Sequence, residues 1–360
     1  MKLFLSGSPT LSRYTEGILK RGFDLLGVEI VPHVHEATHA IAQFHGSPEA
    51  ARFDEDLLSQ MTELYRLKSV VLLFHRPDEI KLRMPCLSEY LRNAPSSWGF
   101  AMLGTFFTSD RFFTETNPLT RMGRRSIRAI PHGFFELPLA TLGRSAPVIV
   151  GTHTTWGEMR SLQTVVGLLA KLFQRRGSLS VAGYLGGLPI DALRRGTVAK
   201  LLSQFNCTAP VVQHQRGKTF EPGAIILNPG DPPDDLDMTF NVQIYHLGDS
   251  VRRGESSGSL HASRGIPVIA EMNGAEQLEG LQVIKVPYSR ETGLSSSLQL
   301  DIAAEQIVSC ISSLEYRAML TSNSAAAAQW GPRAVAREYA AFLTELEANN
   351  ENSLVPGTPI

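Results

Sequence analysis

The chain has 360 residues, of which 43% are hydrophobic and 19% are charged, and its formal net charge at pH 7 is -1. This length allows two domains with separate cores, since a domain typically has about 100–200 residues. The balanced charge argues against a dedicated nucleic-acid binder.

The cysteines and the apolar runs indicate in which cellular compartment the protein is expected. Cys86, Cys207 and Cys310 are widely spaced and form no CxxC pair, and such a sparse, odd set suits a reducing environment better than a disulfide framework. The apolar stretch at residues 2–5 is too short for a signal peptide. No apolar run approaches the roughly 18 residues of a membrane span. We therefore expect a cytoplasmic protein with no transmembrane segment.

The first half of the sequence alternates apolar runs with helical patterns. Residues 2–5 predict a strand, Ser6 and Gly7 a turn, residues 11–26 a helix, and residues 28–31 a second strand. Together they predict a βαβ opening. The turn lacks a GxGxxG pattern, so it does not predict a dinucleotide site.

Residues 35–39 read His-Glu-Ala-Thr-His, which matches the HExxH pattern, and His45 falls where a metzincin protease has its third histidine. On a helix, His35 and His39 would share one face and could hold zinc, with Glu36 activating a water. Against this, Ala42 stands where metzincins have a glycine, no Met-turn follows, and His35 directly follows a predicted strand. The alternative is a partly exposed helix whose histidines bind no metal. The zinc site is kept as a secondary hypothesis.

A second candidate histidine follows a predicted central strand. Residues 47–67 have helical spacing, and residues 70–74 form the continuous apolar run of a parallel strand. His75 comes directly after that run. Ligands in open α/β sheets bind outside the carboxyl ends of strands, so His75 is a better cleft candidate than the earlier histidines. An ordinary loop histidine is the alternative. A further strand is predicted at residues 101–105.

The middle of the chain contains the expected domain boundary. Residues 129–134, Ala-Ile-Pro-His-Gly-Phe, end the last strand of the first half, and an apolar run begins a new sheet at Val148. We place the boundary near Ser145. The expected segments are a first domain at 1–145, a second at 146–313, C-terminal helices at 314–348 and a disordered polar tail at 349–360.

The second half has a more regular alternation. Strands are predicted at residues 148–150, 179–185, 211–214, 243–247, 266–269 and 283–286. Helices are predicted at residues 159–177, 188–205, 298–311 and 316–346, the last interrupted at Trp330-Gly331-Pro332.

The most informative stretch of the second half is residues 254–270, GESSGSLHASRGIPVIA. A serine/glycine loop that opens a helix presents unpaired backbone N–H groups and the positive end of the helix dipole, which can bind phosphate. Glu255 lies beside this loop and could accept bonds from sugar hydroxyls. An ordinary capped loop between strand and helix is the alternative.

This order of a glycine-containing loop, a helix ending at Gly265 and a G-x-P-V-I strand resembles the C-terminal domain of GT-B glycosyltransferases. It is most similar to the retaining, family 4-like group, in the branch with a GE(S/T)SG loop. The Ile130-Pro131-His132-Gly133 segment resembles the strand end that closes their N-terminal domain. The resemblance implies an α/β GT-B fold: two Rossmann-like domains with parallel sheets facing across a cleft, and a C-terminal helix crossing back.

The resemblance also implies a function. The protein would transfer a sugar from a nucleotide-sugar donor to a glycan, lipid-linked or protein acceptor, with retention and without a metal or other cofactor. The C-terminal domain would hold the donor, with the end of the strand at 211–214 over the base. The implied catalytic residues are His75 and Glu255. The implied donor- and phosphate-binding residues are Gly7, Thr154, Thr155, Arg160, Gly254, Ser256, Ser257 and Gly258.

Two departures from the family pattern leave alternatives open. Arg252 and Leu260 occupy the positions of two glutamates that are common in the family. The loop at 152–158 lacks the usual arginine and lysine, and Arg160 is the strong cation close by. A GT-B-shaped binding or scaffold protein without catalysis is therefore one alternative, and a zinc hydrolase using His35, His39 and His45 is another.

Overall fold

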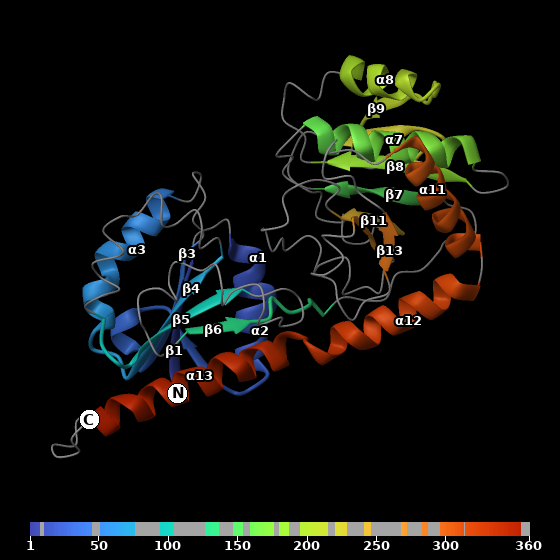
Figure 1. The fold of residues 1–360 in the computed structure, drawn as a ribbon. Coiled ribbons are helices and arrows are strands. Elements are labelled where there is room, and N and C mark those ends of the chain that lie inside the picture. The colour runs from blue at the N-terminus through green and yellow to red at the C-terminus, as the bar shows by residue number, and fades with distance from the viewer. Residues whose placement is uncertain are drawn as a thin grey trace. The chain divides into compact units, whose positions relative to one another are not determined.

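The chain forms two compact units in the computed structural model (Figure 1). Unit 1 comprises Met1–Glu136 and Gln329–Ile360, and unit 2 comprises Leu137–Ala328. The structure describes residues 1–7, 11–44, 51–75, 94–103, 127–136, 147–153, 159–175, 180–186, 195–214, 220–228, 241–245, 268–271, 283–286, 296–312 and 314–353. The expected boundary near Ser145 lies outside these residues. No helix in the described ranges is long and apolar enough to cross a membrane.

Unit 1 is built on a six-stranded parallel sheet with the order β2-β1-β3-β4-β5-β6. Its strands are β1 (Lys2–Ser6), β2 (Glu29–Val31), β3 (His39–Phe44), β4 (Ser69–Phe74), β5 (Trp98–Leu103) and β6 (Ile127–Ile130). All six residues of β3 and all six of β4 are buried, as expected of central strands in a parallel sheet.

Strand β3 corrects the interpretation of the histidine-rich segment. The HExxH match suggested a helix through His35 and His39, but His39 begins a buried strand. His35 lies on a separate single turn of 3-10 helix, η3 (Val34–Glu36). The apolar residues that follow His39 pair in register with β1 and β4, and burial on both faces of the sheet outweighs the helical spacing of the histidines.

Alternate residues of the sheet face two different helical layers. Phe44, Leu72 and Phe100 face helix α3 (Ala51–Leu64), whose Met61 is fully buried among them. On the opposite face lies a continuous helical run of α1 (Ser12–Tyr14), a π-helical segment η2 (Thr15–Lys20) and α2 (Arg21–Asp24).

The last helix, α13 (Pro332–Ser353), also covers this second face and packs against β4, β5 and β6 (Figure 1). A Cβ on Gly99 of β5 would lie 2.5 Å from Cζ of Phe342, so the helix approaches the strand closely. The preceding helix, α12 (Leu314–Gln329), belongs to unit 2 except for its last residue. Helix α13 continues to Ser353, which corrects the expectation that residues 349–353 belong to a disordered tail.

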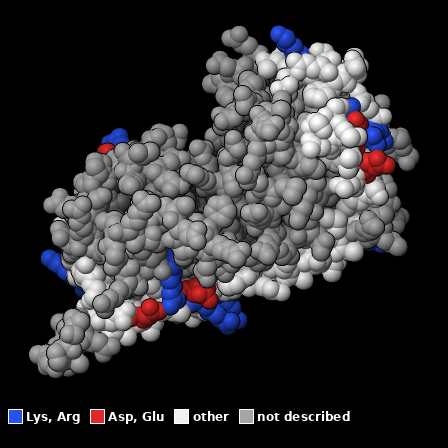
Figure 2. Space-filling view, in the orientation of Figure 1, with Lys and Arg blue, Asp and Glu red and all other residues white. Residues whose placement is uncertain are grey.

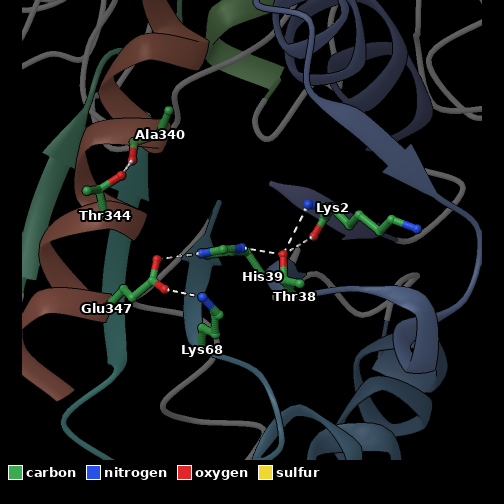
Figure 3. A network of polar contacts seen from close by, with 7 residues as sticks. All are labelled: Lys2, Thr38, His39, Lys68, Ala340, Thr344 and Glu347. Carbon is green, nitrogen blue, oxygen red and sulfur yellow. Dashed lines mark hydrogen bonds and ion pairs between the residues drawn. The ribbon is translucent and has the colours of Figure 1, made fainter. Parts of the chain in front are cut away.

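The C-terminal half of α13 is fixed to the amino ends of β3 and β4 by a polar network (Figure 3). Nε2 of the buried His39 lies 3.2 Å from one carboxylate oxygen of Glu347, and Lys68 Nζ donates to the other at 2.7 Å. The Thr38 hydroxyl lies 2.7 Å from His39 Nδ1. Burial lowers the pKa of His39 despite the neighbouring carboxylate, so the ring is neutral and donates its Nε2–H to Glu347.

We expect Glu347→Ala to destabilise unit 1 by about 2 kcal/mol, because it leaves the buried Nε2–H of His39 without an acceptor. Chemical unfolding followed by circular dichroism measures the loss. Glu345→Ala is the matched control on the same helix. Glu345 pairs with Arg128 at the surface, and such a pair contributes less than about 1 kcal/mol. Equal losses in the two variants would contradict a special role for Glu347.

Unit 2 contains a seven-stranded parallel sheet with the order β13-β12-β11-β7-β8-β10-β9. Its strands are β7 (Val148–His153), β8 (Val181–Gly186), β9 (Val211–Gln213), β10 (Ile225–Asn228), β11 (Val242–Tyr245), β12 (Val268–Glu271) and β13 (Val283–Val286). Six of these were predicted. Strand β10 was not, because its four residues directly precede a Pro/Asp-rich stretch that was interpreted as a loop.

Helices α7 (Met159–Arg175), α8 (Arg195–Gln204) and α11 (Ser297–Ser312) pack with the sheet of unit 2 in one large core. On the other face, Leu320 of α12 packs against Ile149 and Tyr184. Ion pairs join α7 to α11: Lys171 Nζ lies 3.0 Å from Asp301 Oδ2, and Arg175 contacts Asp301 and Glu305. Figure 2 shows basic and acidic side chains of the described residues mostly next to one another on the face drawn.

Both sheets are parallel and each is flanked by helices, so the predicted α/β class with two Rossmann-like units is confirmed.

Candidate functional site

The strand order of unit 1 reverses between β1 and β3, because the chain goes from β1 outward to β2 and then returns to β3 on the other side. The carboxyl ends of strands at such a reversal flank the crevice where open α/β sheets bind ligands. Ser6 ends β1 and is followed by Gly7, and Phe44 ends β3. The neighbouring strand β4 ends at Phe74 and is followed by His75. Two residues predicted from sequence, Gly7 and His75, therefore lie at one edge of the same sheet.

Gln43 connects these strand ends. Its amide Nε2 donates to the Ser6 carbonyl at 2.8 Å and to the Thr15 hydroxyl at 3.0 Å. Its Oε1 lies 3.3 Å from His75 Nε2. A Cβ on Gly7 would lie 3.0 Å from Gln43 Nε2 and 3.3 Å from Thr15 Oγ1, so glycine lets the turn after β1 approach this side chain.

His75 is held by its backbone and by its ring. Its N–H donates to the Phe44 carbonyl at 3.0 Å, which continues the β3–β4 pairing by one residue. Its ring meets the Tyr14 ring edge-on, with centroids 5.2 Å apart and planes at 88°. The side chain is half-buried, between the enclosed strand and the edge of the sheet.

A buried aromatic layer lies behind His75. The Tyr14 ring also packs against His132, with centroids 4.8 Å apart, and the Tyr14 and Tyr339 hydroxyls are 3.5 Å apart. Burial raises the pKa values of both tyrosines, so both hydroxyls keep their protons. Burial lowers the pKa of His132 to about 4, and its Nδ1 lies 3.1 Å from the Gly133 carbonyl. The Ile-Pro-His-Gly segment therefore supports the site from within the core.

The chemistry available at this edge is that of hydrogen-bonding groups: an amide, an imidazole and hydroxyls. The buried Ser6 Oγ has no hydrogen-bond partner within the described part of the chain. Such groups suit the recognition of a polyhydroxylated ligand by hydrogen bonds. Thr15 begins the π-helical segment η2, and π-helical turns occur frequently at functional sites.

The zinc hypothesis loses its geometric basis. His35 is exposed on η3 and stacks on His33, with ring centroids 5.4 Å apart, whereas His39 is buried against Glu347. The two do not share a helical face. His45 lies outside the described residues. Among the side chains that the structure describes, no group of three or more His, Cys, Asp or Glu residues is placed to hold a metal ion.

In unit 2 the strand order reverses between β7 and β11. The first predicted donor segment, with Thr154 and Thr155, follows β7 in the sequence. The second, from Gly254 to Gly258 with Glu255, follows β11. Both segments lie outside the described residues, as do Ser256 and Ser257. Arg160 is in the first turn of α7, and its side chain is likewise outside the described part.

A second polar and aromatic cluster, which the sequence did not predict, lies near the carboxyl ends of β8, β9 and β10. Asn228 Nδ2 donates to the Tyr184 hydroxyl at 2.9 Å. His214, one residue after β9, stacks on Phe220 with ring centroids 6.1 Å apart, and Phe220 meets Tyr184 edge-on. The end of the strand at 211–214 was expected over a nucleotide base, and flat aromatic faces are suited to stacking on one.

Comparison with solved structures shows which known proteins have a similar fold. The chain is similar to a glycosyltransferase from Rickettsia africae, with 11% identity and a TM-score of 0.52 over 96% of this chain and 98% of that one. It is also similar to α,α-trehalose 6-phosphate synthase from Burkholderia multivorans, with 11% identity and a TM-score of 0.52 over 96% and 83% of the two chains. It is similar as well to the pneumococcal O-GlcNAc transferase GtfA, with 12% identity and a TM-score of 0.51 over 80% of this chain and 59% of that one.

The chain spans 61% of its match in the GtfA/B complex and 54% of TarM, so several similar structures are considerably longer. The sequence matches no protein-family model, and no curated protein matches it. At these low identities the similarity shows the fold alone, which is GT-B.

Proposed function

We propose that this protein is a glycosyltransferase that moves a sugar from a nucleotide-sugar donor to an acceptor with retention and without a metal. The acceptor is a glycan, a lipid-linked sugar or a protein. Unit 2 holds the donor, and His75 of unit 1 is the proposed catalytic histidine.

One observation carries the proposal. The two segments that the sequence singled out for donor binding follow β7 and β11, the two strands between which the sheet of unit 2 reverses. That is the place where an open α/β sheet binds a nucleotide or similar ligand. The serine/glycine content of the second segment and the resemblance of both segments to GT-B donor loops were noted before the strand order was known. The GT-B fold and the aromatic cluster around His214 support the same assignment.

The proposed roles follow from charge. Negative charge develops on the leaving diphosphate during sugar transfer, so groups that stabilise the diphosphate lower the barrier. Backbone N–H groups of Ser256, Ser257 and Gly258 bind it, and Arg160 adds a positive charge. Gly254 and the hydroxyls of Thr154 and Thr155 complete the donor site, and Glu255 accepts hydrogen bonds from sugar or ribose hydroxyls.

The test compares thermal stability and turnover with UDP-, GDP-, ADP- and TDP-sugars in the native protein and in Glu255→Ala. UDP-sugars come first, because the pneumococcal O-GlcNAc transferase of similar fold was solved in complex with UDP and GlcNAc. We expect one nucleotide sugar to raise the melting temperature and to be turned over. The variant should bind that donor about 10- to 100-fold more weakly, the size of a lost charged hydrogen bond.

Glu305→Ala, which removes an exposed carboxylate from α11, is the control and should behave like the native protein. Binding without turnover would favour the binding-protein alternative, which the Arg252 and Leu260 departures suggest. Absence of any nucleotide effect at millimolar concentration would reject both the donor site and the transferase.

A further inference from the structure

The Thr15 hydroxyl differs from two other helical threonines in the group that it bonds. Thr321 and Thr344 donate their hydroxyl hydrogens to the carbonyl oxygens four residues earlier, at 3.0 and 2.9 Å. This is a common bond for a threonine inside a helix. Thr15, half-buried at the start of η2, lies instead 3.0 Å from Nε2 of Gln43 on strand β3. Its hydrogen bond therefore leads across to the sheet rather than back along its own helix.

The direction of this bond is determined by Ser6. The Ser6 carbonyl oxygen can only accept, and it lies 2.8 Å from the same end of the Gln43 amide, so that end must be the NH₂ group. One hydrogen of the NH₂ group goes to Ser6 and the other to the Thr15 oxygen, because an amide nitrogen is a donor only. Thr15 is thus an acceptor towards Gln43, and its own hydroxyl hydrogen must point to a different group.

That hydrogen is available for a ligand. Among the residues that the structure describes, the only hydrogen bond of the Thr15 side chain is the one that it accepts from Gln43. A hydroxyl that accepts one bond is a stronger donor in the next, because the members of a hydrogen-bonded chain polarise one another. A Cβ on Gly7 would lie 3.3 Å from Thr15 Oγ1, so glycine at this position keeps that side of the hydroxyl clear of a side chain.

The hydroxyl lies at the edge of the sheet where a ligand is expected. Its partner Gln43 joins the carboxyl ends of β1 and β3, between which the strand order reverses. We propose that Thr15 donates a hydrogen bond to a hydroxyl oxygen of a neutral sugar acceptor, and that Gln43 sets the direction of this bond. An uncharged hydroxyl and amide suit such a ligand. That the sugar is the acceptor rests on the proposed function, whereas the direction of the hydroxyl does not.

The experiment measures the binding of simple sugars without any donor. The methyl glycosides of glucose, galactose, mannose and N-acetylglucosamine are titrated into the native protein and its variants, and saturation-transfer NMR gives the dissociation constants. We expect one glycoside to bind the native protein at millimolar concentration. Thr15→Val keeps the shape of the side chain but has no hydroxyl, and it should bind that glycoside about 3- to 10-fold more weakly, the size of one neutral hydrogen bond.

Two further variants control for the substitution itself. Thr15→Ser keeps the hydroxyl and should bind the glycoside like the native protein. Thr344→Val also removes a helical hydroxyl from unit 1, but one that bonds its own helix, and it should leave binding unchanged. Equal affinity of Thr15→Val and the native protein for the glycoside would overturn the proposal. So would the failure of all four glycosides to bind at millimolar concentration.

Deoxy analogues of the bound glycoside distinguish a direct bond from a structural effect. Each analogue lacks one hydroxyl. The analogue that lacks the hydroxyl contacted by Thr15 should bind the native protein and Thr15→Val equally, because neither pair can form the bond. If Thr15→Val instead weakens every analogue as much as it weakens the parent glycoside, then Thr15 only supports the fold and the proposal is wrong.

A measurement on the native protein keeps the test decisive if Thr15→Val fails to fold. In protein labelled with ¹⁵N-threonine, the Thr15 amide signal is assigned by its loss in Thr15→Ser. The bound glycoside should shift this signal, and an unshifted signal would overturn the proposal.

The outcomes also separate this inference from the proposed function. Sugar binding that depends on Thr15, in a protein that turns over no nucleotide sugar, would uphold the Thr15 bond and reject the transferase. Turnover by a protein whose sugar binding is the same with and without the Thr15 hydroxyl would do the reverse.

Discussion

Replacing Gly22 with alanine is expected to destabilise unit 1 by about 3 kcal/mol. A Cβ at this position of α2 would lie 2.2 Å from the Pro332 carbonyl oxygen and 2.8 Å from the Ala336 Cβ. A backbone oxygen at the start of α13 cannot move aside as a flexible side chain would. The clash outweighs the gain of about 1 kcal/mol that alanine brings to a helix interior over glycine.

The measurement is urea unfolding followed by tryptophan fluorescence. In a Trp156→Phe background the remaining two tryptophans, Trp98 and Trp330, both belong to unit 1. Gly27→Ala is the control: nothing lies within 4 Å of its added Cβ, but its φ of 69° imposes a cost of about 1 kcal/mol. If Gly22→Ala loses no more stability than Gly27→Ala, then α13 does not begin against α2 as described.

Most strands were predictable because central strands of a parallel sheet are continuous apolar runs bounded by turns. Residues 70–74 show this signal plainly, and they lie in the buried strand β4. Strand β3 was missed for a physical reason. Its first residue is a histidine and its fifth a glutamine, so the run of buried apolar residues is short and the histidine spacing suggested a helix. Partners far along the chain satisfy both polar groups, and no local pattern reveals them.

The residues of the candidate site in unit 1 could be singled out one at a time but not as a cluster, and their roles stay predictions. Gly7 and His75 could be identified because each follows a strand. Gln43, Tyr14 and Thr15 could not, since their role depends on the order and register of β1, β3 and β4 and on the helix that covers them. The one sequence signal that could have identified Gln43 is a glutamine near the end of an apolar run. For Glu255 and the loop around it, the assignment stays a prediction.

Unit 1 is expected to lose about 3 kcal/mol of stability as the pH falls from 6.5 to 4. Burial lowers the pKa of His132 from 6.5 to about 4, so in this range the unfolded chain binds a proton that the folded protein does not. The stability from the neutral ring is thus complete above pH 6.5, falls as the pH drops, and stops falling below about pH 4. The ring packs against Tyr14 and Phe135, where a positive charge would have no water.

The pH dependence of the urea midpoint measures this effect, and His132→Asn isolates it. Asparagine keeps a side-chain N–H but does not titrate. The variant should show a much shallower slope between pH 6.5 and 5, whatever its stability at pH 8. Some slope should remain, because the pKa of His39 is also lowered by burial. The lowered pKa of Glu347 acts in the same direction, but only below pH 4.5. Equal slopes in His132→Asn and the native protein would place His132 in contact with water.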